Sequence, residues 1–437
     1  MIRSFCQMSR RLATHHGFRR VLLAAAAISS YVFFYHRCAL PNAIDNFLDL
    51  PSFYAASVAV FRDHLSPYDV GRLTRINGLE FRTYPFLYPP PSLFLFQPLA
   101  TTSLAQAKHI LTSLNHLTLI PTLLLIPSLM LKLSPRREFW RFSFCLLYPL
   151  YSCPLILTVR YGQTNIVMLA ALVAFWIAAQ RDKSVLAGLC LCVAILCKTT
   201  PVLFIPMLLV VGRWKVVAYT LLSFMMVSVV SLFSLPSGIW SEWLFRVAPS
   251  SGYMNEPFGL FPPASVWNQS LNGALARHFT RSSWSDPGFH SPGLGKILTY
   301  CAAASVMALS AITLRGVRHS PRAVSLLSAI TLPMIFLVAP FSWEHHGAYL
   351  IPAILFVVCH QIPGSKLWRI SALAAALITA ITFTSPALML YRLASALSLW
   401  ALALAITWRD RVELRGIPPS GRSNELSPSE RRSAQSL

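Results

Sequence analysis

The sequence predicts an all-α protein that crosses a membrane many times, and three observations point to this class. Of its 437 residues, 55% are hydrophobic and only 12% are charged. Apolar runs of membrane-spanning length recur from one end of the chain to the other. Lys and Arg collect in the short breaks between these runs. We therefore expect a bundle of about twelve transmembrane helices.

The net charge of +22 has a simple explanation in such a protein. On a soluble domain it would indicate nucleic-acid binding, but the cytoplasmic loops of membrane proteins collect Lys and Arg. We therefore expect no nucleic-acid partner. The nine cysteines form no CxxC pair and no metal-like spacing, and six of them lie inside apolar runs. The sequence predicts no cofactor, and dependence on a divalent cation is left open.

The chain begins with a basic segment, residues 1–20, which we expect in the cytoplasm, followed by an uncleaved first helix at Val21–Leu40. Later apolar runs predict spans at Ser103–Leu131, Phe139–Val159, Asn165–Gln180, Trp214–Leu235, Ile297–Leu314, Ala323–Pro340, Gly347–Ile362, Leu367–Ser385 and Ala387–Trp408.

Two apolar stretches do not fit single spans. Phe86–Leu99 contains four prolines and is shorter than the roughly 20 residues that a crossing needs. We expect it to be re-entrant or interfacial. Val185–Val211 is interrupted at Lys198 and has basic residues at both ends. We expect two short helices that meet at Lys198, where a polar cavity permits irregular backbone.

Threaded by charge, most of the 37 Lys and Arg fall on the cytoplasmic side, with both termini inside. The transmembrane domain is then residues 21–408, with two large outer loops at 41–102 and 236–296. The tail, residues 409–437, is rich in Ser, Pro and Arg and is expected to be disordered.

Asp49 follows the first predicted helix and precedes Pro51. A carboxylate here can act as a general base that takes the proton of an attacking hydroxyl. The alternative is a helix cap, which Asp before a Pro-led helix often provides. The residues alone do not separate the two interpretations. Asp45 is the less favoured base.

A polar corner at Arg160, Gln163 and Asn165 follows the third predicted span. Amide side chains suit sugar hydroxyls because they both donate and accept hydrogen bonds, although helix capping by Thr164 or Asn165 is the simpler interpretation. Lys198 is a cation inside an apolar run, which is costly and usually functional. It could hold a phosphate at the headgroup level, or extend its ammonium to the interface.

Two further clusters lie at predicted outer ends of the chain's apolar runs. Asn268 and Gln269 close the second large loop and suit sugar or headgroup binding; Asn268 also has the spacing of a glycosylation acceptor. Glu344, His345 and His346 precede a predicted span. We favour phosphate binding or acid–base chemistry over metal binding there, because adjacent His side chains point in different directions on a helix.

These clusters occur in the order found in a known family. The motifs are Asp49-x-Pro51-x-Phe53-Tyr54-x-Ala56, Pro67-Tyr68-Asp69, Tyr88-Pro89-Pro90, Gly162-Gln163-Thr164-Asn165, Lys198-x-x-Pro201, Asn268-Gln269-Ser270 and Ser342-Trp343-x-His345-His346. Together they resemble glycosyltransferase family 87, the DUF2029 group, over nearly the whole chain. Glu344 stands where that family often has a shorter acid.

The resemblance implies a GT-C fold, a lipid-phosphate sugar donor, an active site at the outer membrane face and a catalytic Asp in the first outer loop, which is Asp49. We expect an inner-membrane glycosyltransferase that moves a sugar from a polyprenyl-phosphate donor to a lipid or glycan hydroxyl. Mannose is the sugar that we expect. In this interpretation Lys198, Arg160, His345 and His346 face the donor phosphate, while Gln163, Asn165, Asn268, Gln269, Glu344 and Tyr54 contact the sugar or acceptor. The alternatives are a transporter or flippase of lipid-linked sugars, which would need polar residues in both membrane halves, and a non-catalytic scaffold.

Overall fold

The computed structural model describes residues 2–39, 49–78, 83–133, 139–360, 366–380 and 391–414. Within these ranges the regular structure is helical, with one isolated bridge between Ser282 and Ser285. This confirms the all-α class. Five helices are long and apolar enough to cross a membrane: Arg19–Cys38, Leu104–Met130, Phe139–Tyr161, Trp214–Ser234 and Pro292–Arg315. Shorter apolar helices lie among them, so the five do not give a full count of crossings.

The first part of the described chain contains eleven helical elements, of which the last begins just after Lys198. They are α1 (Ile2–Ala39), α2 (Leu50–Phe61), α3 (Val70–Asn77), η1 (Pro90–Leu95), η2 (Gln97–Thr101), α4 (Leu104–Leu133), α5 (Phe139–Tyr151), α6 (Cys153–Tyr161), α7 (Asn165–Gln180), α8 (Ser184–Cys197) and η3 (Thr200–Leu203).

The second half continues to the last described residue. Its elements are α9 (Phe204–Val210), α10 (Trp214–Ser234), α11 (Ile239–Glu242), the π-turn η4 (Trp243–Val247), α12 (Ala248–Ser250), η5 (Pro257–Gly259), α13 (Leu271–Phe279), α14 (Pro292–Arg315), α15 (Ala323–Val338), η6 (Glu344–Leu350), α16 (Ile351–Cys359), α17 (Lys366–Ala380) and α18 (Tyr391–Leu414).

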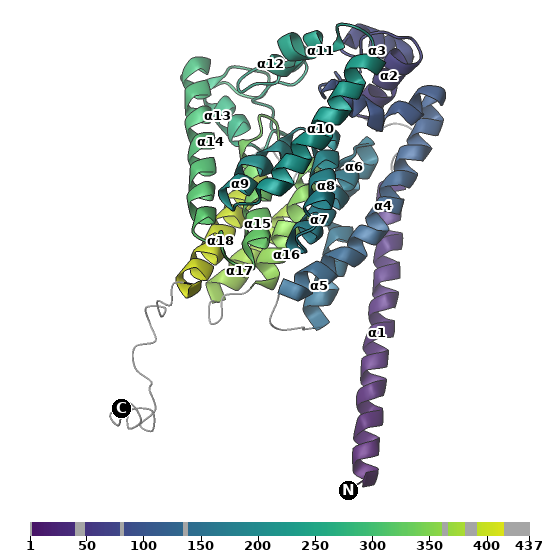
Figure 1. Cartoon of the computed structure of the whole chain (residues 1–437), viewed down its shortest axis with the longest axis vertical. Coiled ribbons are helices and arrows are strands. Elements are labelled where there is room, and N and C mark those ends of the chain that lie inside the picture. Colours follow the sequence, from purple (N-terminus) through teal and green to yellow (C-terminus); the bar gives the residue numbers. More distant parts are fainter. Residues whose placement is uncertain are drawn as a thin grey trace, which may run out of the picture.

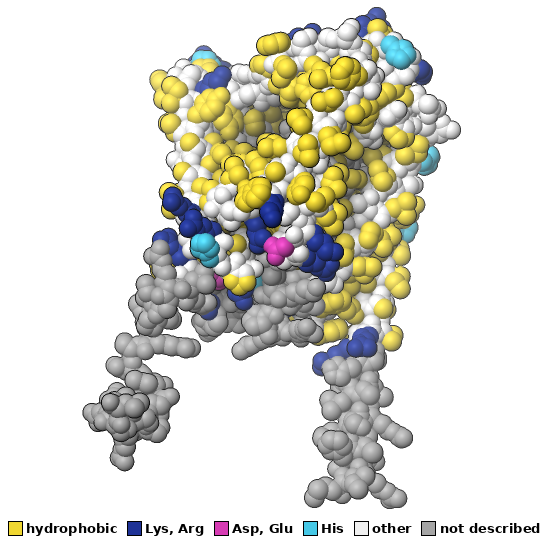
Figure 2. Space-filling view, in the orientation of Figure 1, with side chains coloured by type: hydrophobic (Ala, Val, Ile, Leu, Met, Phe, Trp, Pro, Cys, Tyr) yellow, Lys and Arg dark blue, Asp and Glu magenta, His cyan; other side chains and the backbone are white. Residues whose placement is uncertain are grey.

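The long helices run between two unlike ends of the molecule (Figure 1). The start of α1 and the end of α18 lie at one end, and α2, α3, α11 and α12 gather at the other. We call these the terminal end and the loop end. Hydrophobic side chains cover much of the face in Figure 2, and a belt of Lys and Arg lies below them toward the terminal end. This arrangement is what the charge pattern predicted.

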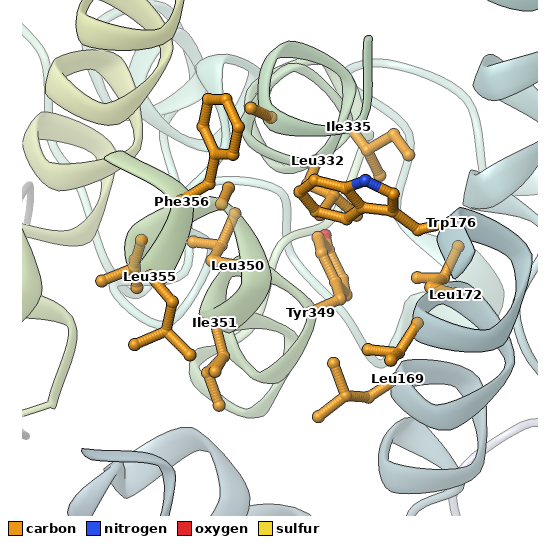
Figure 3. Packing of buried hydrophobic residues seen from close by; sticks show 14 of the residues in the cluster. Leu169, Leu172, Trp176, Leu332, Ile335, Tyr349, Leu350, Ile351, Leu355 and Phe356 are labelled. Atoms are coloured by element: carbon orange, nitrogen blue, oxygen red, sulfur yellow. The ribbon is translucent and has the colours of Figure 1, made fainter. Parts of the chain in front are cut away.

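The core between the helices is a large apolar cluster. Figure 3 shows Trp176 of α7 among Leu332 and Ile335 of α15 and Tyr349 of η6, all buried. Packing of this kind brings α7, α15 and η6 together. It thereby places the polar cluster at the start of α7, with Asn165, beside the cluster in η6, with His345.

The first outer loop has its own, smaller core. Phe53 of α2 stacks on Phe96 with ring centroids 4.5 Å apart, and Phe86 packs edge-on against both. Phe86–Leu99 forms the short turns η1 and η2 over Pro90–Thr101, which agrees with a segment that does not span. These aromatic contacts hold α2 against η1 and η2.

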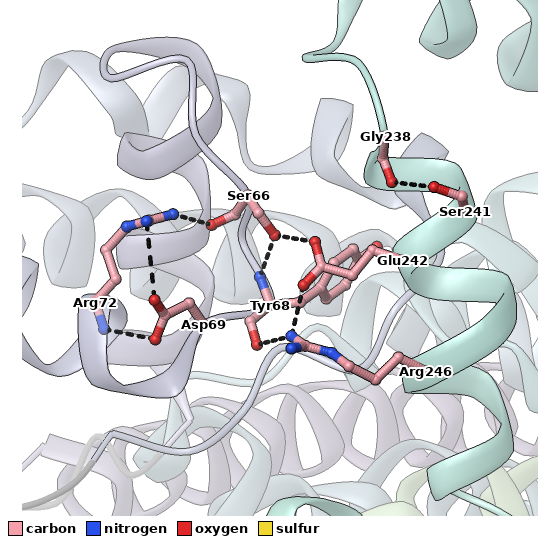
Figure 4. Close-up of polar contacts among 8 residues, drawn as sticks. All are labelled: Ser66, Tyr68, Asp69, Arg72, Gly238, Ser241, Glu242 and Arg246. Atoms are coloured by element: carbon pink, nitrogen blue, oxygen red, sulfur yellow. Dashed lines mark hydrogen bonds and ion pairs between the residues drawn. The ribbon is translucent and has the colours of Figure 1, made fainter.

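Polar contacts join the two outer loops (Figure 4). The Ser66 hydroxyl donates to a Glu242 carboxylate oxygen at 2.5 Å, and Arg246 donates to the Tyr68 carbonyl at 3.0 Å. Asp69 caps α3 by accepting from the Arg72 N–H at 3.1 Å. These bonds tie the first loop to the start of the second.

The interrupted stretch around Lys198 has the predicted form. The chain turns at Lys198 between α8 and η3, and the backbone there is extended, with φ −162° and ψ 134°. The turns that flank this pair of short helices meet, because Arg213 and Asp182 form an ion pair. The start of α8 and the end of α9 therefore lie on the same side of the bundle.

Two boundaries differ from those that the sequence predicted. The predicted span at Phe139–Val159 agrees with the apolar stretch Phe139–Tyr161, but its helix is interrupted at Ser152 between α5 and α6, because Pro154 lacks the N–H that a continuous helix needs. α18 continues to Leu414, so residues 409–414 of the predicted tail are helical. Residues 415–437, like 40–48 with Asp45, lie outside the described ranges.

Candidate active site

Asp49 stands at the N-cap position of α2, but its side chain does not cap the helix. The whole first turn of α2 is described, and the Asp49 carboxylate accepts no capping hydrogen bond from it. The backbone N–H of Asp49 donates to the Tyr161 carbonyl at 3.1 Å, which ties the start of α2 to the end of α6. The carboxylate is thus available for another partner.

That partner is the polar corner after α6. Burial raises the pKa of Asp49 to about 6, against the opposing effects of a hydrogen bond from the Gln163 side chain and of the Lys198 charge. A carboxyl group with this pKa is charged at neutral pH and is a better proton acceptor than an ordinary Asp. The environment of Asp49 therefore suits a base.

The corner itself is built by a glycine. Gly162 ends α6 with a positive φ of 68°, a conformation that favours glycine, and the chain then enters α7 through Gln163 and Thr164. Thr164 occupies the N-cap of α7 without a side-chain capping bond; its hydroxyl donates to the Cys197 carbonyl at 3.4 Å. The simpler capping interpretation of Thr164 is therefore wrong.

Lys198 and Asn165 are in direct contact. The Lys198 ammonium donates to Asn165 Oδ1 at 3.2 Å, and the Asn165 amide donates to the His345 carbonyl at 3.1 Å. Lys198 is only 8% exposed, so its side chain does not extend to the surface of the fold. A buried ammonium needs partners, and this one has an amide and the nearby Asp49 carboxylate.

The two histidines complete the cluster from η6. The His345 ring packs edge-on against Tyr161, with centroids 5.5 Å apart, and against His346 at 4.5 Å. His346 Nδ1 accepts from the Trp343 N–H at 3.2 Å, which leaves its proton on Nε2. The buried Nε2 of His345 has no hydrogen-bond partner within the described part of the chain. A ligand can supply that partner.

Glu344 is held by an arginine that the sequence analysis did not single out. Arg392 of α18 is 1% exposed and lies 3.8 Å from the Glu344 carboxylate, and it donates to the Glu344 carbonyl at 2.8 Å. The signal was present in the sequence, because Arg392 is a cation inside a predicted span, as Lys198 is.

The remaining predicted residues have structural contacts. Asn268 is fully buried; its amide donates to the carbonyls of Pro263 and Pro340, and its oxygen accepts from the Ser342 N–H at 3.0 Å. It fastens the second outer loop to the segment before η6, and its burial contradicts the glycosylation interpretation. The Gln269 N–H donates to the Ser342 carbonyl at 2.8 Å.

Tyr54 and Arg160 lie at the margins of the cluster. The Tyr54 hydroxyl donates to the Thr102 carbonyl at 3.0 Å and connects α2 with the end of η2. Arg160 lines a cavity on the other side of α6. The structure thus brings Asp49, Gln163, Asn165, Lys198, His345 and His346 into one cluster.

A metal is not an evident part of this cluster. Across the ranges that the structure describes, no three His, Cys, Asp or Glu side chains are grouped so that they could hold a metal ion. The available chemistry is that of one carboxylate, one ammonium, two imidazoles and several amides.

Comparisons with known proteins agree with the resemblance noted above. The sequence model described as glycosyltransferase family 87 matches residues 86–340. A polyprenol-phosphate-mannose-dependent α-(1-2)-phosphatidylinositol pentamannoside mannosyltransferase of Mycobacterium tuberculosis is 28% identical over 49% of the chain and 45% of its own length. A polyprenol-phosphate-mannose-dependent α-(1-2)-phosphatidylinositol mannoside mannosyltransferase of Mycolicibacterium smegmatis is 24% identical over 77% of this chain and 77% of its own length. The protein of the same name from M. tuberculosis is 24% identical over 71% of this chain and 70% of its own length. The first of these matches therefore spans less than half of its relative.

Proposed function

Because the chain belongs to glycosyltransferase family 87, we propose that it transfers mannose from a polyprenyl-phosphate donor to a hydroxyl of a lipid or glycan acceptor. The observation that carries this proposal is the cluster at the corner formed by Gln163 and Asn165, where Gln163 bonds to the Asp49 carboxylate and Asn165 accepts from the Lys198 ammonium. The curated relatives supply the donor and suggest a phosphatidylinositol mannoside as the acceptor class.

In the proposed reaction, Asp49 takes the proton of the acceptor hydroxyl as its oxygen attacks the anomeric carbon. The bond from that carbon to the phosphate oxygen breaks, and the electron pair leaves with the polyprenyl phosphate. Because the reaction is a single displacement assisted by one base, it predicts inversion of configuration at the anomeric carbon.

Lys198 and the imidazoles would stabilise the charge that develops on the leaving phosphate, which is where preorganised donors contribute most. His345 Nε2 is the buried group without a partner and is suited to donate to a phosphate oxygen. Arg160, which the sequence predicted for the same phosphate, lies in the last turn of α6 and lines the cavity on the other side of that helix. Gln163 and Asn165 would orient the sugar.

We further propose about twelve crossings of the inner membrane, with both termini in the cytoplasm and the reaction on the extracytoplasmic side. The separation of the basic terminal end from the loop end supports this orientation. Transport of a lipid-linked sugar is the alternative function; it is less well supported because the candidate residues cluster around one corner.

The test is an assay of purified protein in detergent with radiolabelled polyprenyl-phosphate mannose and a phosphatidylinositol mannoside acceptor. Wild type should form product, and Asp49→Asn should lower kcat by about 10²–10⁴. Asp63→Asn, an exposed acid of the same loop, is the matched control and should keep its activity. Equal turnover by wild type and Asp49→Asn rejects Asp49 as the base, and labelled donor that moves across proteoliposomes without product would favour transport.

A further inference from the structure

A groove between α14 and α18 lies toward the terminal end of the molecule, where both of these helices end (Figure 1). Its volume is about 580 Å³, and it is lined by Thr313 of α14 and by Leu404, Ala405, Trp408 and Arg409 of α18. We call it the α14–α18 groove. Its volume is in the range of pockets that hold one ligand of moderate size, and the mechanism above does not use it.

Two contacts hold the helices together on either side of this groove. Further from the terminal end, the indole N–H of Trp400 donates to the Ser310 hydroxyl at 2.9 Å and joins α18 to α14. Nearer to the terminal end, a Cβ added at Gly316 would come within 2.5 Å of Arg411 Cδ, so α18 crosses close to the end of α14. The lining residues lie between these two contacts on both helices. The groove is therefore bounded at both ends by the fold itself.

The lining changes from apolar to cationic along α18. Leu404 and Ala405 lie one helical turn before Trp408 and Arg409, so the four side chains follow one face of the helix. Because α18 runs toward the terminal end, the cation lies nearest to that end. Trp408 is 64% exposed and comes directly before the arginine. Apolar side chains followed by an indole and a cation are typical of the boundary between membrane hydrocarbon and headgroups.

The surroundings of this end of the groove are basic. The last turns of α14 and α18, with the turn after α14, carry five arginines: Arg315, Arg318, Arg322, Arg409 and Arg411. Two acids, Asp410 and Glu413, are near them in the sequence, and Asp410 pairs with Arg322 at 3.7 Å. Lys and Arg side chains gather in the region of these helix ends in Figure 2. The excess of positive charge suits an anionic ligand.

We propose that the α14–α18 groove binds an anionic phospholipid, with its phosphate at Arg409 and an acyl chain along Leu404 and Trp408. The guanidinium group can donate charge-assisted hydrogen bonds to the phosphate, and the apolar lining suits the chain but offers nothing to a small free anion. In the orientation proposed above, this lipid belongs to the cytoplasmic leaflet, whose surface is negatively charged. It goes beyond the proposed function, because the lipid takes no part in the transfer.

The groove is connected through α18 to the candidate active site. The first turn of α18 carries Arg392, which donates to the Glu344 carbonyl, and later turns of the same helix line the groove. A lipid that packs between α14 and α18 therefore stabilises the helix that holds η6. The bound lipid should raise the thermal stability of the protein.

The first experiment follows the thermal midpoint of purified, delipidated protein in detergent as phosphatidylglycerol is added. The midpoint of wild type should rise, and the concentration that gives half of the rise should increase by about tenfold in Arg409→Gln, since this change removes charge-assisted hydrogen bonds to the phosphate. Phosphatidylcholine, which has no net charge, should be about tenfold less effective on wild type. Arg281→Gln is the matched control, because Arg281 is an exposed cation of the second outer loop that pairs with Asp286.

The second experiment maps the lipid directly. A phosphatidylglycerol with a diazirine in an acyl chain should label peptides of α18 in wild type, and excess unlabelled phosphatidylglycerol should remove this labelling. Ala405→Trp, which fills the groove, should abolish it. Ala304→Trp, at an exposed position of α14 outside the groove, is the matched control and should keep it. Excess phosphatidylcholine and inorganic phosphate should not compete.

Gel filtration and the thermal midpoint without added lipid check that the variants fold. Because Arg409→Gln acts by charge and Ala405→Trp by volume, a loss of the fold in one variant leaves the other to decide. A lipid response that the folded variants leave unchanged rejects the site.

The competitors give two further outcomes that would overturn the proposal. Equal competition by phosphatidylcholine rejects recognition of the headgroup charge, because the groove would then be ordinary lipid-facing surface. Competition by inorganic phosphate would indicate a site for a free anion instead. These measurements do not need turnover, so their result is separate from that of the transferase assay.

Discussion

At the residue scale, the chemistry of the candidate site is set by which neighbours each charged group has. Asp49 has Gln163 and Lys198 near its carboxylate, and Lys198 has Asn165. The sequence predicted Asp49 and Lys198 as individual residues, because an acid before a Pro-led helix and a cation inside an apolar run are visible in one dimension. It could not decide between cap and base for Asp49, since that depends on where the side chain points.

The pH dependence of the reaction tests the environment of Asp49. Its pKa is raised to about 6, so the charged, proton-accepting form dominates above that pH and is lost as the pH falls through it. The kcat/KM for the acceptor should therefore decline by about tenfold per pH unit below the pKa. A profile that stays flat down to pH 4.5 would contradict the assignment; the pH stability of the protein, followed by gel filtration, is the control.

Substitution of Lys198 tests the role of the buried ammonium. Lys198→Met keeps the length of the side chain and removes the charge, so kcat should fall by about 10²–10³, as for other lost electrostatic contacts in active sites. Lys108→Met, a lysine of α4, is the control. Retention of near-normal kcat with a folded Lys198→Met protein would show that the charge is not used.

At the element scale, the site depends on short helices that are interrupted where the polar residues lie. α6, α8 and η6 all end or begin at the cluster. The sequence predicted the bounds of α7, the break at Lys198 and the span that α5 and α6 share. It did not predict the interruption at Ser152, and its span began three residues after the start of η6. Pro154 was a visible signal for the interruption. For the start of η6, no local signal distinguishes a 3₁₀ turn from the loop before it.

The contact between α18 and η6 should be necessary for stability. Arg392→Met leaves the buried Glu344 carboxylate and carbonyl without their partner, and the expected cost is about 3–5 kcal/mol of unfolding free energy. A strong decrease in the thermal midpoint in detergent would show it. Arg62→Met, at an exposed ion pair, should change stability by about 0.5 kcal/mol or less.

A double variant separates the pair from its surroundings. If Arg392 stabilises mainly by pairing with Glu344, then Arg392→Met combined with Glu344→Gln should be less destabilised than the sum of the single variants. Strict additivity would mean that the two side chains act independently.

At the scale of the whole molecule, a belt of Lys and Arg lies toward the terminal end, and other basic side chains lie at the loop end (Figure 2). The charge pattern predicted the belt, because cytoplasmic loops retain Lys and Arg. It could not predict that the second outer loop would fold back through Asn268 onto the segment before η6. That contact joins residues more than seventy positions apart, and such pairings leave no periodic trace in a sequence.

Accessibility of single cysteines tests the orientation in the membrane. In a background without native cysteines, Gly252→Cys in the second outer loop should react with an impermeant maleimide in intact cells. Lys183→Cys, in the turn between α7 and α8, should react only after the cells are opened. The reverse pattern would invert the topology.

Gly188 brings α8, the helix that ends at Lys198, into close contact with α10. A Cβ at this position would come within 2.6 Å of the Tyr219 Cβ and 2.9 Å of the Thr220 nitrogen, so α8 and α10 touch through their backbones. Neither helix has room to slide or roll against the other. A side chain of different reach at position 198 would consequently find no compensating shift of the scaffold, and even arginine, with the same charge, should miss the place that lysine occupies.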